Sequence, residues 1–348
     1  MIEIDGSYGE GGGAILRQAL ALSTLTNQPF EINNIRKGRP KPGLKAQHMH
    51  SIIALEKISK CSVMGCEVGS EKLTFIPGTV TNKTIDVDVG TAGSITLLMQ
   101  SLLLPIIFSE KTVTLNITGG TDVKWSQPID YFASVLVPHL KEYADIEVKT
   151  MQRGYYPKGN GKVTIKIKSK TNQEELLPIL LDEKGELLQI KGISHASADL
   201  INAKVADRQA KNAEILLSDL RVPVSITRQY SNSLSTGSGI TLWAVFSKNS
   251  YDEIPVILGG DALDEKGKRA ESVGEEAAFN LKKEVKSEAV VDSYLADQLI
   301  PLLGLTKGII KTSKITKHTE SNIYVTKKFL DVTFEVENNH IKASLADK

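Results

Sequence analysis

The stretch that decides the fold is GEGGGAILRQALALSTLT at residues 9–26, where a glycine run passes directly into an apolar, helix-like pattern. Glycines let the backbone approach a ligand closely, and the free N–H groups at the start of the following helix attract anions. Glu10 offers a hard oxygen for a divalent ion beside a phosphate, and Arg17, one turn into the helix, is placed to reach that phosphate. A Gly-Lys-Ser/Thr sequence is missing, which excludes a Walker-type P-loop. A tight strand-to-helix turn that needs glycine for its geometry explains the run equally well.

Outward from this stretch, helix-like periodicity alternates with β-branched runs. The interleaving predicts an α/β or α+β fold with helices packed on sheets. Helices are expected at residues 14–26, 44–59, 93–108, 128–143, 204–220, 270–286 and 293–303. Strands between them are expected at residues 30–35, 74–77, 84–89, 112–118, 146–149 and 163–168.

The order of these elements suggests an internal repeat. A strand, a Gly-rich turn, a helix, an extended segment and a second helix follow one another twice, and the helices at 270–286 and 293–303 predict a third copy, without any repeat of individual residues. Residues 182–268 depart from this repeating order and contain strands around one long helix. We therefore expect a large domain of residues 1–181 and 269–348, built from three βα units, with a small α/β domain inserted at residues 182–268.

The composition is that of a globular protein, with 41% hydrophobic and 24% charged residues. Cys61 and Cys66 are too few for a disulfide framework and have no partners at zinc spacing, which fits a reducing cytosol. The first residues lack a signal-peptide pattern, and the apolar stretch at 95–108 is too short to span a bilayer. These features predict a cytoplasmic protein without a membrane segment.

The net charge of +1 gives no global indication of nucleic-acid binding. Three segments, at residues 35–45, 149–172 and 306–318, nevertheless contain several cations and no acidic residue. Such segments suit phosphate ligands. Lysines that protect exposed strand edges are an equally good explanation.

Further motifs point to phosphates and RNA. In the loop at 36–48, Arg39 can form a bidentate fork with phosphate, whereas His48 and His50 point to different sides of a helix and are not expected to bind a metal. A glycine-rich helix start at 90–94 precedes Gln100. The turn RGYYPKGNGK at 153–162 places aromatics beside cations, a mixture that favours single-stranded RNA; a plain hairpin turn is the alternative.

Two segments near the carboxyl end complete the set of candidates. Tyr294, Asp297 and Gln298 share one helix face. On this pattern alone, an ordinary solvent-exposed face is slightly favoured over a binding face. His318 follows a basic run and lies between two apparent strands. A lone histidine is usually structural or on the surface, and spacing alone does not make His318 a nucleophile.

Taken together, these segments resemble the RNA 3'-terminal phosphate cyclase family over nearly the whole chain. The resemblance rests on the order and spacing of the motifs at residues 9–17, 36–47, 90–100, 119–122, 153–161, 265–278, 294–298 and 318–322. It implies three repeated units, each similar to the C-terminal domain of translation initiation factor three, with a small domain inserted into the third. Asn160 and Ala14 depart from the family pattern without touching the implied chemistry.

The resemblance also implies roles for individual residues. His318 matches the histidine that becomes adenylylated, and Glu10 matches the glutamate that binds Mg²⁺ or Mn²⁺ beside the phosphates. The implied adenylate pocket consists of Gln100, Tyr294, Leu295, Ala296, Asp297 and Gln298. Polar residues of the catalytic cleft are matched by Arg17, Arg39 and Gln47, of which we expect Arg39 to lie closest to the terminal phosphate of the RNA.

The implied reaction is that of an ATP-dependent ligase. His318 attacks the α-phosphorus of ATP and expels pyrophosphate, AMP passes to the RNA 3'-phosphate to give RNA(3')pp(5')A, and the 2'-hydroxyl then closes the 2',3'-cyclic phosphodiester and releases AMP. A neutral imidazole is a good nucleophile near pH 7, and cations neutralise the phosphates. Cyclase-like binding proteins of ribosome assembly lack this histidine, and an enolpyruvyl transferase of related architecture would need no covalent nucleotide. Homo-oligomerisation is left open.

Overall fold

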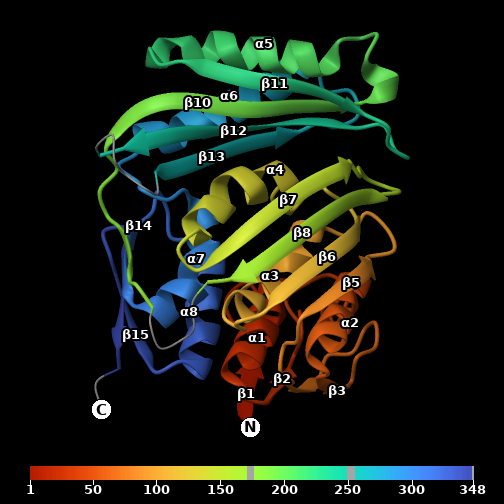
Figure 1. Ribbon diagram of the computed structural model, residues 1–348, viewed down its shortest axis with the longest axis vertical. Coiled ribbons are helices and arrows are strands. Elements are labelled where there is room, and N and C mark those ends of the chain that lie inside the picture. The colour runs from red at the N-terminus through yellow and green to blue at the C-terminus, as the bar shows by residue number, and fades with distance from the viewer. Residues whose placement is uncertain (171–175, 249–254, 347–348) are drawn as a thin grey trace.

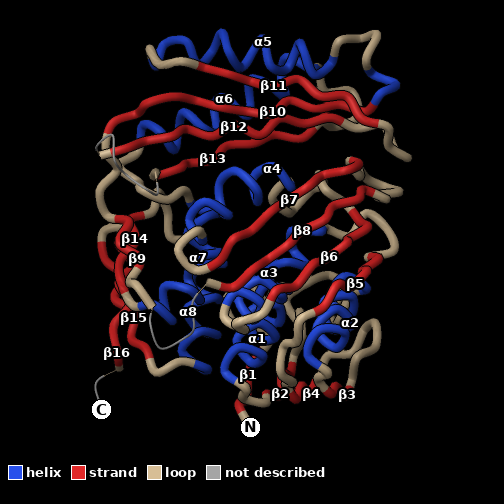
Figure 2. The backbone as a smooth tube through the Cα atoms, viewed as in Figure 1, coloured by secondary structure: helices blue, strands red, loops and turns tan. Residues whose placement is uncertain are grey.

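The computed structural model describes residues 1–170, 176–248 and 255–346. In this part of the chain the strands form four sheets of four strands each, and helices pack on and between them (Figure 1; Figure 2). The expected α/β class is therefore confirmed. One sheet with helices α5 and α6 forms an upper body in Figure 1, and the other three sheets lie below it.

The first two sheets repeat one topology. The first unit has the strand order β1-β2-β4-β3 and consists of β1 (Ile2–Asp5), α1 (Gly13–Thr26), β2 (Phe30–Asn33), α2 (Ala46–Ser59), β3 (Ser62–Met64) and β4 (Leu73–Ile76). The second has the order β5-β6-β8-β7 and consists of β5 (Lys83–Asp88), α3 (Ile95–Ile107), β6 (Thr112–Gly119), α4 (Ile129–Tyr131) with further helical turns to Leu140, β7 (Ala144–Gln152) and β8 (Gly161–Ser169). In each unit the first two strands are parallel.

The third unit has the same topology, but its helices differ from the predicted pair at residues 270–286 and 293–303. The observed pair is Ser293–Thr306 and Lys317–Phe329. Its strand order is β9-β14-β16-β15, and it consists of β9 (Ile179–Leu181), α7 (Ser293–Thr306), β14 (Gly308–Lys311), α8 (Lys317–Phe329), β15 (Val332–Glu337) and β16 (His340–Leu345). The three sheets of the large domain thus share one strand order. His318 does lie between two strands of the chain, β14 and β15, but it is on a helix, α8, that the sequence did not predict. Thr316 caps this helix, with Thr319 at the third helical position. The β-branched residues around this cap favour strands, so the cap was not recognised in the sequence.

The upper body has a core of its own. It consists of β10 (Glu186–Ser197), α5 (Val205–Leu217), β11 (Val224–Ser231), β12 (Ser238–Ser247), β13 (Val256–Leu263) and α6 (Ala270–Lys286), with the strand order β11-β10-β12-β13. The sequence placed α6 in the large domain, but this helix packs on α5, β12 and β13. Val273, Ala277 and Leu281 of α6 are buried in the upper core. We infer that the inserted unit continues through α6.

The main core is built around three helices that are apolar on nearly every side, as expected of buried helices. Every residue of α1 from Ala14 to Leu25 is buried, and α3 and α7 are almost as enclosed. α1 contacts α2, α3 and α8. Among the described residues, no helix combines the length and apolarity needed to cross a bilayer.

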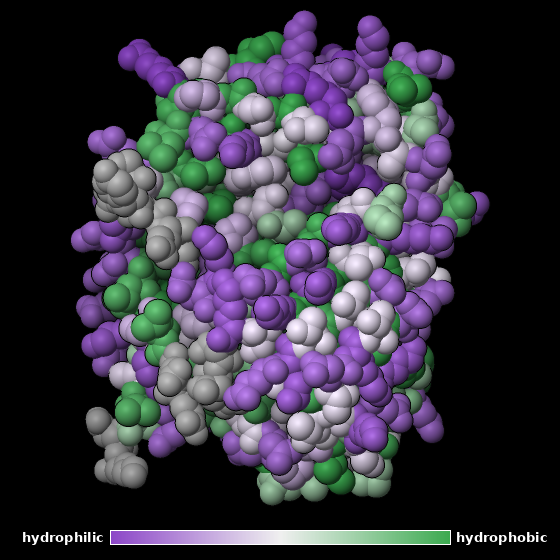
Figure 3. All heavy atoms as spheres, in the orientation of Figure 1, coloured by the Kyte–Doolittle hydropathy of each residue, from purple (hydrophilic) through white to green (hydrophobic). Residues whose placement is uncertain are grey.

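The basic segment at residues 149–172 lies mainly on an exposed sheet surface. Along β8, Lys162, Lys166 and Lys168 point outward while Val163 and Ile165 are buried. The face over β7 and β8 is accordingly mostly hydrophilic in Figure 3. This alternation fits the solvated-strand explanation of these lysines.

Candidate active site

The first turns of four helices converge in the large domain. A Cβ atom on Gly13, at the start of α1, would collide with the ring of His48 in the first turn of α2. The side-chain amide of Gln47 lies 3.5 Å from the carbonyl oxygen of Ser94, the N-cap of α3. The start of α8 faces the loop that precedes α1, because the side chain of His318 lies against that of Glu10. Helix N-termini present free N–H groups and a partial positive charge, so this arrangement attracts anions.

His318 is the second residue of α8 and is held at a capped helix start. The Thr316 hydroxyl accepts hydrogen bonds from the backbone N–H groups of His318 and Thr319, both at 3.0 Å. The His318 side chain is 46% exposed, and its Nε2 atom lies 3.1 Å from Glu10 Oε2. The other oxygen of Glu10 accepts a hydrogen bond from Arg39. An accessible imidazole, a carboxylate and a guanidinium thus meet from three distant segments of the chain.

Arg17 brings a buried positive charge to the same region. Its Nε atom donates a 2.7 Å hydrogen bond to Gln100 Oε1, and within the described ranges it forms no ion pair. Burial, followed by the nearby Arg36, lowers the pKa of Arg17 to about 10. Because a buried cation without a counter-charge is costly, an anion bound here would be stabilised.

His48 is a residue of this region that the sequence analysis considered only as a metal ligand. Burial, together with Arg17, Arg36 and Lys45, lowers the pKa of His48 to about 3, so its ring is neutral at pH 7. Nδ1 accepts the backbone N–H of Lys45 at 3.1 Å, which leaves the proton on Nε2, the atom that faces Gly13. Its position beside Gln47, after a basic loop, is the sequence feature that could have identified His48 as a residue of the site.

Asp297 lies under the start of α8 and does not face solvent. Its Oδ1 atom accepts hydrogen bonds from the hydroxyls of Thr316 at 2.7 Å and Thr319 at 2.6 Å, and Asn322 donates to its carbonyl oxygen. Burial raises the pKa of Asp297, although these hydroxyls oppose the shift. Of the polar face predicted for α7, Asp297 therefore fixes the helix start that carries His318.

The other residues of the predicted adenylate pocket divide into three environments. Tyr294 is 57% exposed, whereas Leu295 and Ala296 are fully buried in the main core. Gln100 and Gln298 line one cavity between α3 and α7. The two glutamines are thus brought together.

Glu10 is the residue that could hold a divalent cation at this site. Mg²⁺ is commonly bound through one or two carboxylates together with phosphates of the substrate and water. A single carboxylate beside a region that attracts anions fits that pattern, and the chemistry it would supply is neutralisation of phosphate charge.

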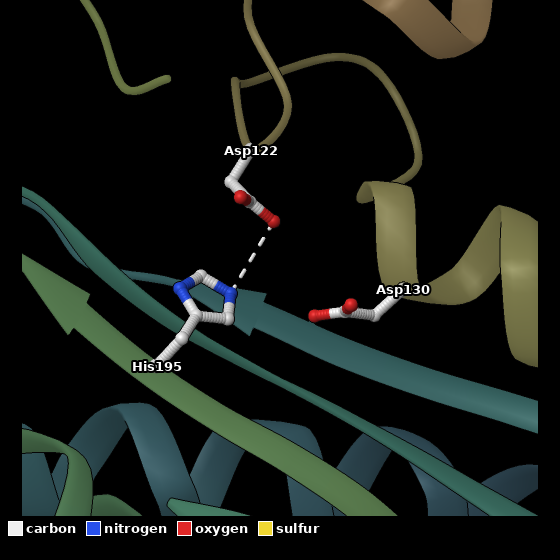
Figure 4. Close-up of side chains that lie close together, drawn as sticks. All are labelled: Asp122, Asp130 and His195. Carbon is white, nitrogen blue, oxygen red and sulfur yellow. Dashed lines mark ion pairs between the residues drawn. The ribbon is translucent and has the colours of Figure 1, made fainter. Parts of the chain in front are cut away.

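A second polar cluster joins the large domain to the inserted unit. Figure 4 shows Asp122, Asp130 and His195, whose potential ligand atoms lie within 4.8 Å of one another. Arg153 donates to Asp122 at 3.1 Å and to Asp130 at 2.7 Å, so its guanidinium already supplies the positive charge that a metal ion would bring. His195 Nε2 lies 3.3 Å from Asp122 Oδ1 without hydrogen-bond alignment. We interpret the cluster as a buried ion network.

This network changes the interpretation of the turn at residues 153–162. Arg153 and Tyr155 are 3% exposed, and the Tyr155 hydroxyl lies 2.9 Å from His195 Nδ1. Neither side chain is free to stack on or pair with RNA, whereas Tyr156 is 76% exposed. The aromatic and basic residues of this turn are therefore used in part to attach the inserted unit.

Comparisons with known proteins agree along nearly the whole chain. Residues 8–336 match the family described as RNA 3'-terminal phosphate cyclase. A protein of that name from Pyrococcus furiosus is 47% identical over 338 residues, which cover 97% of this chain and 95% of the relative. One from Archaeoglobus fulgidus is 43% identical over 344 residues, covering 98% and 99%. One from Saccharolobus solfataricus is 43% identical over 340 residues, covering 97% and 96%.

Proposed function

Because the chain belongs to the RNA 3'-terminal phosphate cyclase family, we propose that it converts an RNA 3'-phosphate into a 2',3'-cyclic phosphodiester with consumption of ATP. The observation that carries this proposal is the position of His318. It is an exposed imidazole at a capped helix start, 3.1 Å from Glu10, which also pairs with Arg39. A nucleophile, a carboxylate and phosphate-binding cations are the groups that nucleotidyl transfer requires.

In the first step, the four helix starts and Arg17 bind the triphosphate, and an unprotonated ring nitrogen of His318 attacks the α-phosphorus. A phosphorus–nitrogen bond forms and pyrophosphate leaves. If Nε2 is the attacking atom, Glu10 must give up its present contact with that nitrogen. A Mg²⁺ or Mn²⁺ ion held by Glu10 would neutralise phosphate charge.

In the second step, an oxygen of the RNA 3'-phosphate attacks the adenylyl phosphorus, and His318 leaves as the free imidazole. Arg39, which pairs with Glu10, and Gln47, which approaches the start of α3, would contact the RNA phosphate in this proposal. The ribose 2'-hydroxyl then attacks the activated 3'-phosphorus, and AMP departs. Because this closure needs a 2'-hydroxyl, the substrate must end in a ribonucleotide.

An oligoribonucleotide with a 3'-phosphate tests this reaction. With ATP and Mg²⁺, we expect a product that resists phosphatase, together with one AMP per RNA end. The same RNA with a 2'-O-methyl terminal ribose should stop at RNA(3')pp(5')A, because the attacking hydroxyl is gone. If the methylated RNA releases AMP as fast as the unmodified one, the product is not a cyclic phosphate and the proposal is wrong.

The hydrogen bonds of Asp297 predict that this residue positions His318. Asp297→Ala removes the acceptor for Thr316 and Thr319. Hydrogen bonds to a charged group contribute about 1.5–3 kcal/mol, so we expect the kcat of adenylylation to fall roughly 10- to 150-fold, with little change in the KM for ATP. Rapid-quench measurement of enzyme-bound label gives both constants.

Gln298→Ala is the matched control on the same helix. Its amide contacts only the carbonyl oxygen of Tyr294, at 3.4 Å, among the described residues, and it lines the cavity shared with Gln100. This variant should change the KM for ATP more than kcat. A raised KM with unchanged kcat in Asp297→Ala would instead make Asp297 a direct ATP contact.

A further inference from the structure

Trp125 has an unusual environment for a tryptophan. Its side chain is 94% exposed, whereas Trp243, the other tryptophan of the chain, is partly buried against the main core. The backbone of Trp125 has a φ of 64°, in the left-handed region that bulky residues seldom adopt. A lone exposed apolar side chain needs no functional explanation, but a large aromatic held outward in a strained conformation does.

The loop that carries Trp125 is fixed to the start of α3. Gly120 donates to the carbonyl of Gly93 at 2.7 Å, and Ile95 donates to Gly120 at 2.9 Å. On the other side of the tryptophan, the Thr96 hydroxyl donates to the carbonyl of Gln127 at 2.7 Å. Both ends of the loop are therefore anchored at the start of α3.

This position places Trp125 beside the candidate active site. Thr96 lies one helical turn before Gln100, which binds the buried Arg17. The Ser94 carbonyl, in the same turn as Thr96, is approached by Gln47. Lys124, next to the tryptophan, is held by Glu265 of the inserted unit at 3.1 Å. The loop that carries the indole thus lies next to the start of α3, at the edge of the region that attracts phosphates.

We propose that Trp125 is a stacking platform for a nucleobase close to the 3' end of the RNA substrate, an inference that rests on the proposed function. Aromatic side chains stack on unpaired bases in sequence-tolerant RNA binding, and the accompanying cations contact the phosphates. With the terminal phosphate bound at the helix starts, the indole holds a base of the last few nucleotides outside the cleft.

Fluorescence tests the contact directly. Trp243→Phe leaves Trp125 as the sole tryptophan, and its emission should be quenched saturably by a 3'-phosphorylated oligoribonucleotide in the absence of ATP. Ribose 3-phosphate, which has no base, should not quench it. In the reciprocal variant, Trp125→Phe, the emission of Trp243 should not respond to RNA. An unquenched Trp125 at saturating RNA would overturn the inference.

Kinetics provide the second test. Stacking of a base on an aromatic side chain corresponds to roughly 5- to 150-fold in affinity, so Trp125→Ala should raise the KM for RNA within that range. Formation of the His318 adenylate from ATP alone should be unchanged. Phe279→Ala removes an aromatic on α6 that is 69% exposed and serves as the matched control, with no change in either measurement. Trp125→Phe should retain most of the affinity.

An abasic series identifies the stacked base and separates this inference from the proposed function. RNAs with one abasic site at each of the last three nucleotides are compared in the wild type and in Trp125→Ala. The difference between the two proteins should disappear at one abasic position. If it persists unchanged at all three, Trp125 does not stack on a base near the end. Failure of the wild type to form an adenylate would contradict the proposed function instead.

Discussion

The His318→Ala protein is expected to carry no label after incubation with α-labelled ATP and Mg²⁺ followed by denaturation, while the wild type approaches one AMP per chain. Without the imidazole, no ring nitrogen lies at the start of α8 to form the covalent bond. Nucleophile removal typically costs several orders of magnitude in rate. Because His318 is 46% exposed and its side chain pairs only with Glu10 among the described residues, the variant should unfold at the same temperature as the wild type.

The chemistry of the bond needs a separate control. A phosphorus–nitrogen bond is labile in acid and stable in alkali whether it is formed with histidine or with lysine, and Lys314 and Lys317 lie within four residues of His318. Lys314→Ala and Lys317→Ala should retain the label, and a peptide map should place AMP on His318. AMP found on either lysine would contradict the assignment.

One helix of each core illustrates what could be predicted, because its apolar residues repeat with helical periodicity. α1 and α6 begin and end within one residue of the predicted bounds. α8 could not be predicted in the same way. Its residues Ile323, Tyr324, Val325 and Thr326 favour strands, and packing against α1 and α7 overrides that preference. The cap at Thr316 is a local signal for this helix, but it lies within a β-branched run.

The site itself depended on distances that no local pattern contains. Glu10, Arg39 and His318 are separated by up to 308 positions and meet because the start of α8 in the third unit faces the loop that precedes α1 in the first. The resemblance to the family identified these three residues as site residues, whereas their contacts follow from the topology of the fold. Asp297 illustrates the limit most clearly, because helical spacing assigned it to a polar face without indicating that the partner of this face is the start of α8.

The junction with the inserted unit was also hidden from the sequence. Asp122, Asp130, Arg153 and His195 come from separate segments, and only their contacts and burial in the folded chain show that they form a unit. The basic turn around Arg153 suggested an RNA contact because sequence alone cannot distinguish an exposed arginine from one that is enclosed by carboxylates. This enclosure has a direct consequence for stability.

Arg153→Met is expected to destabilise the protein by about 3–5 kcal/mol, because it leaves two buried carboxylates without their counter-charge. The Arg153 side chain is 3% exposed, and those of Asp122 and Asp130 are 0% and 9% exposed. Arg228→Met is the matched control. It breaks a pair with Glu214 that is 36% and 30% exposed and should cost no more than about 1 kcal/mol. Urea unfolding followed by circular dichroism measures both.

The charge origin of the effect can be separated from the loss of packing. Adding Asp122→Asn and Asp130→Asn to Arg153→Met removes the uncompensated charges and should restore much of the lost stability. If the triple variant is as unstable as Arg153→Met, lost packing accounts for the effect.

Acid provides an independent readout of the same network. Burial alone would raise the pKa of the Asp122 carboxyl, but His195 and Arg153 together hold it well below its usual range. A carboxyl whose pKa is lower in the folded than in the unfolded protein contributes stability above its unfolded pKa of about 4, and this contribution is lost as the pH falls below that value. The wild type should therefore lose stability steadily from about pH 4 downward. Arg153→Met, in which part of this lowering is gone, should start from a lower stability and show a shallower dependence on pH. Parallel curves for the two proteins would mean that Arg153 does not lower the pKa of Asp122, and the network would then contribute through packing alone.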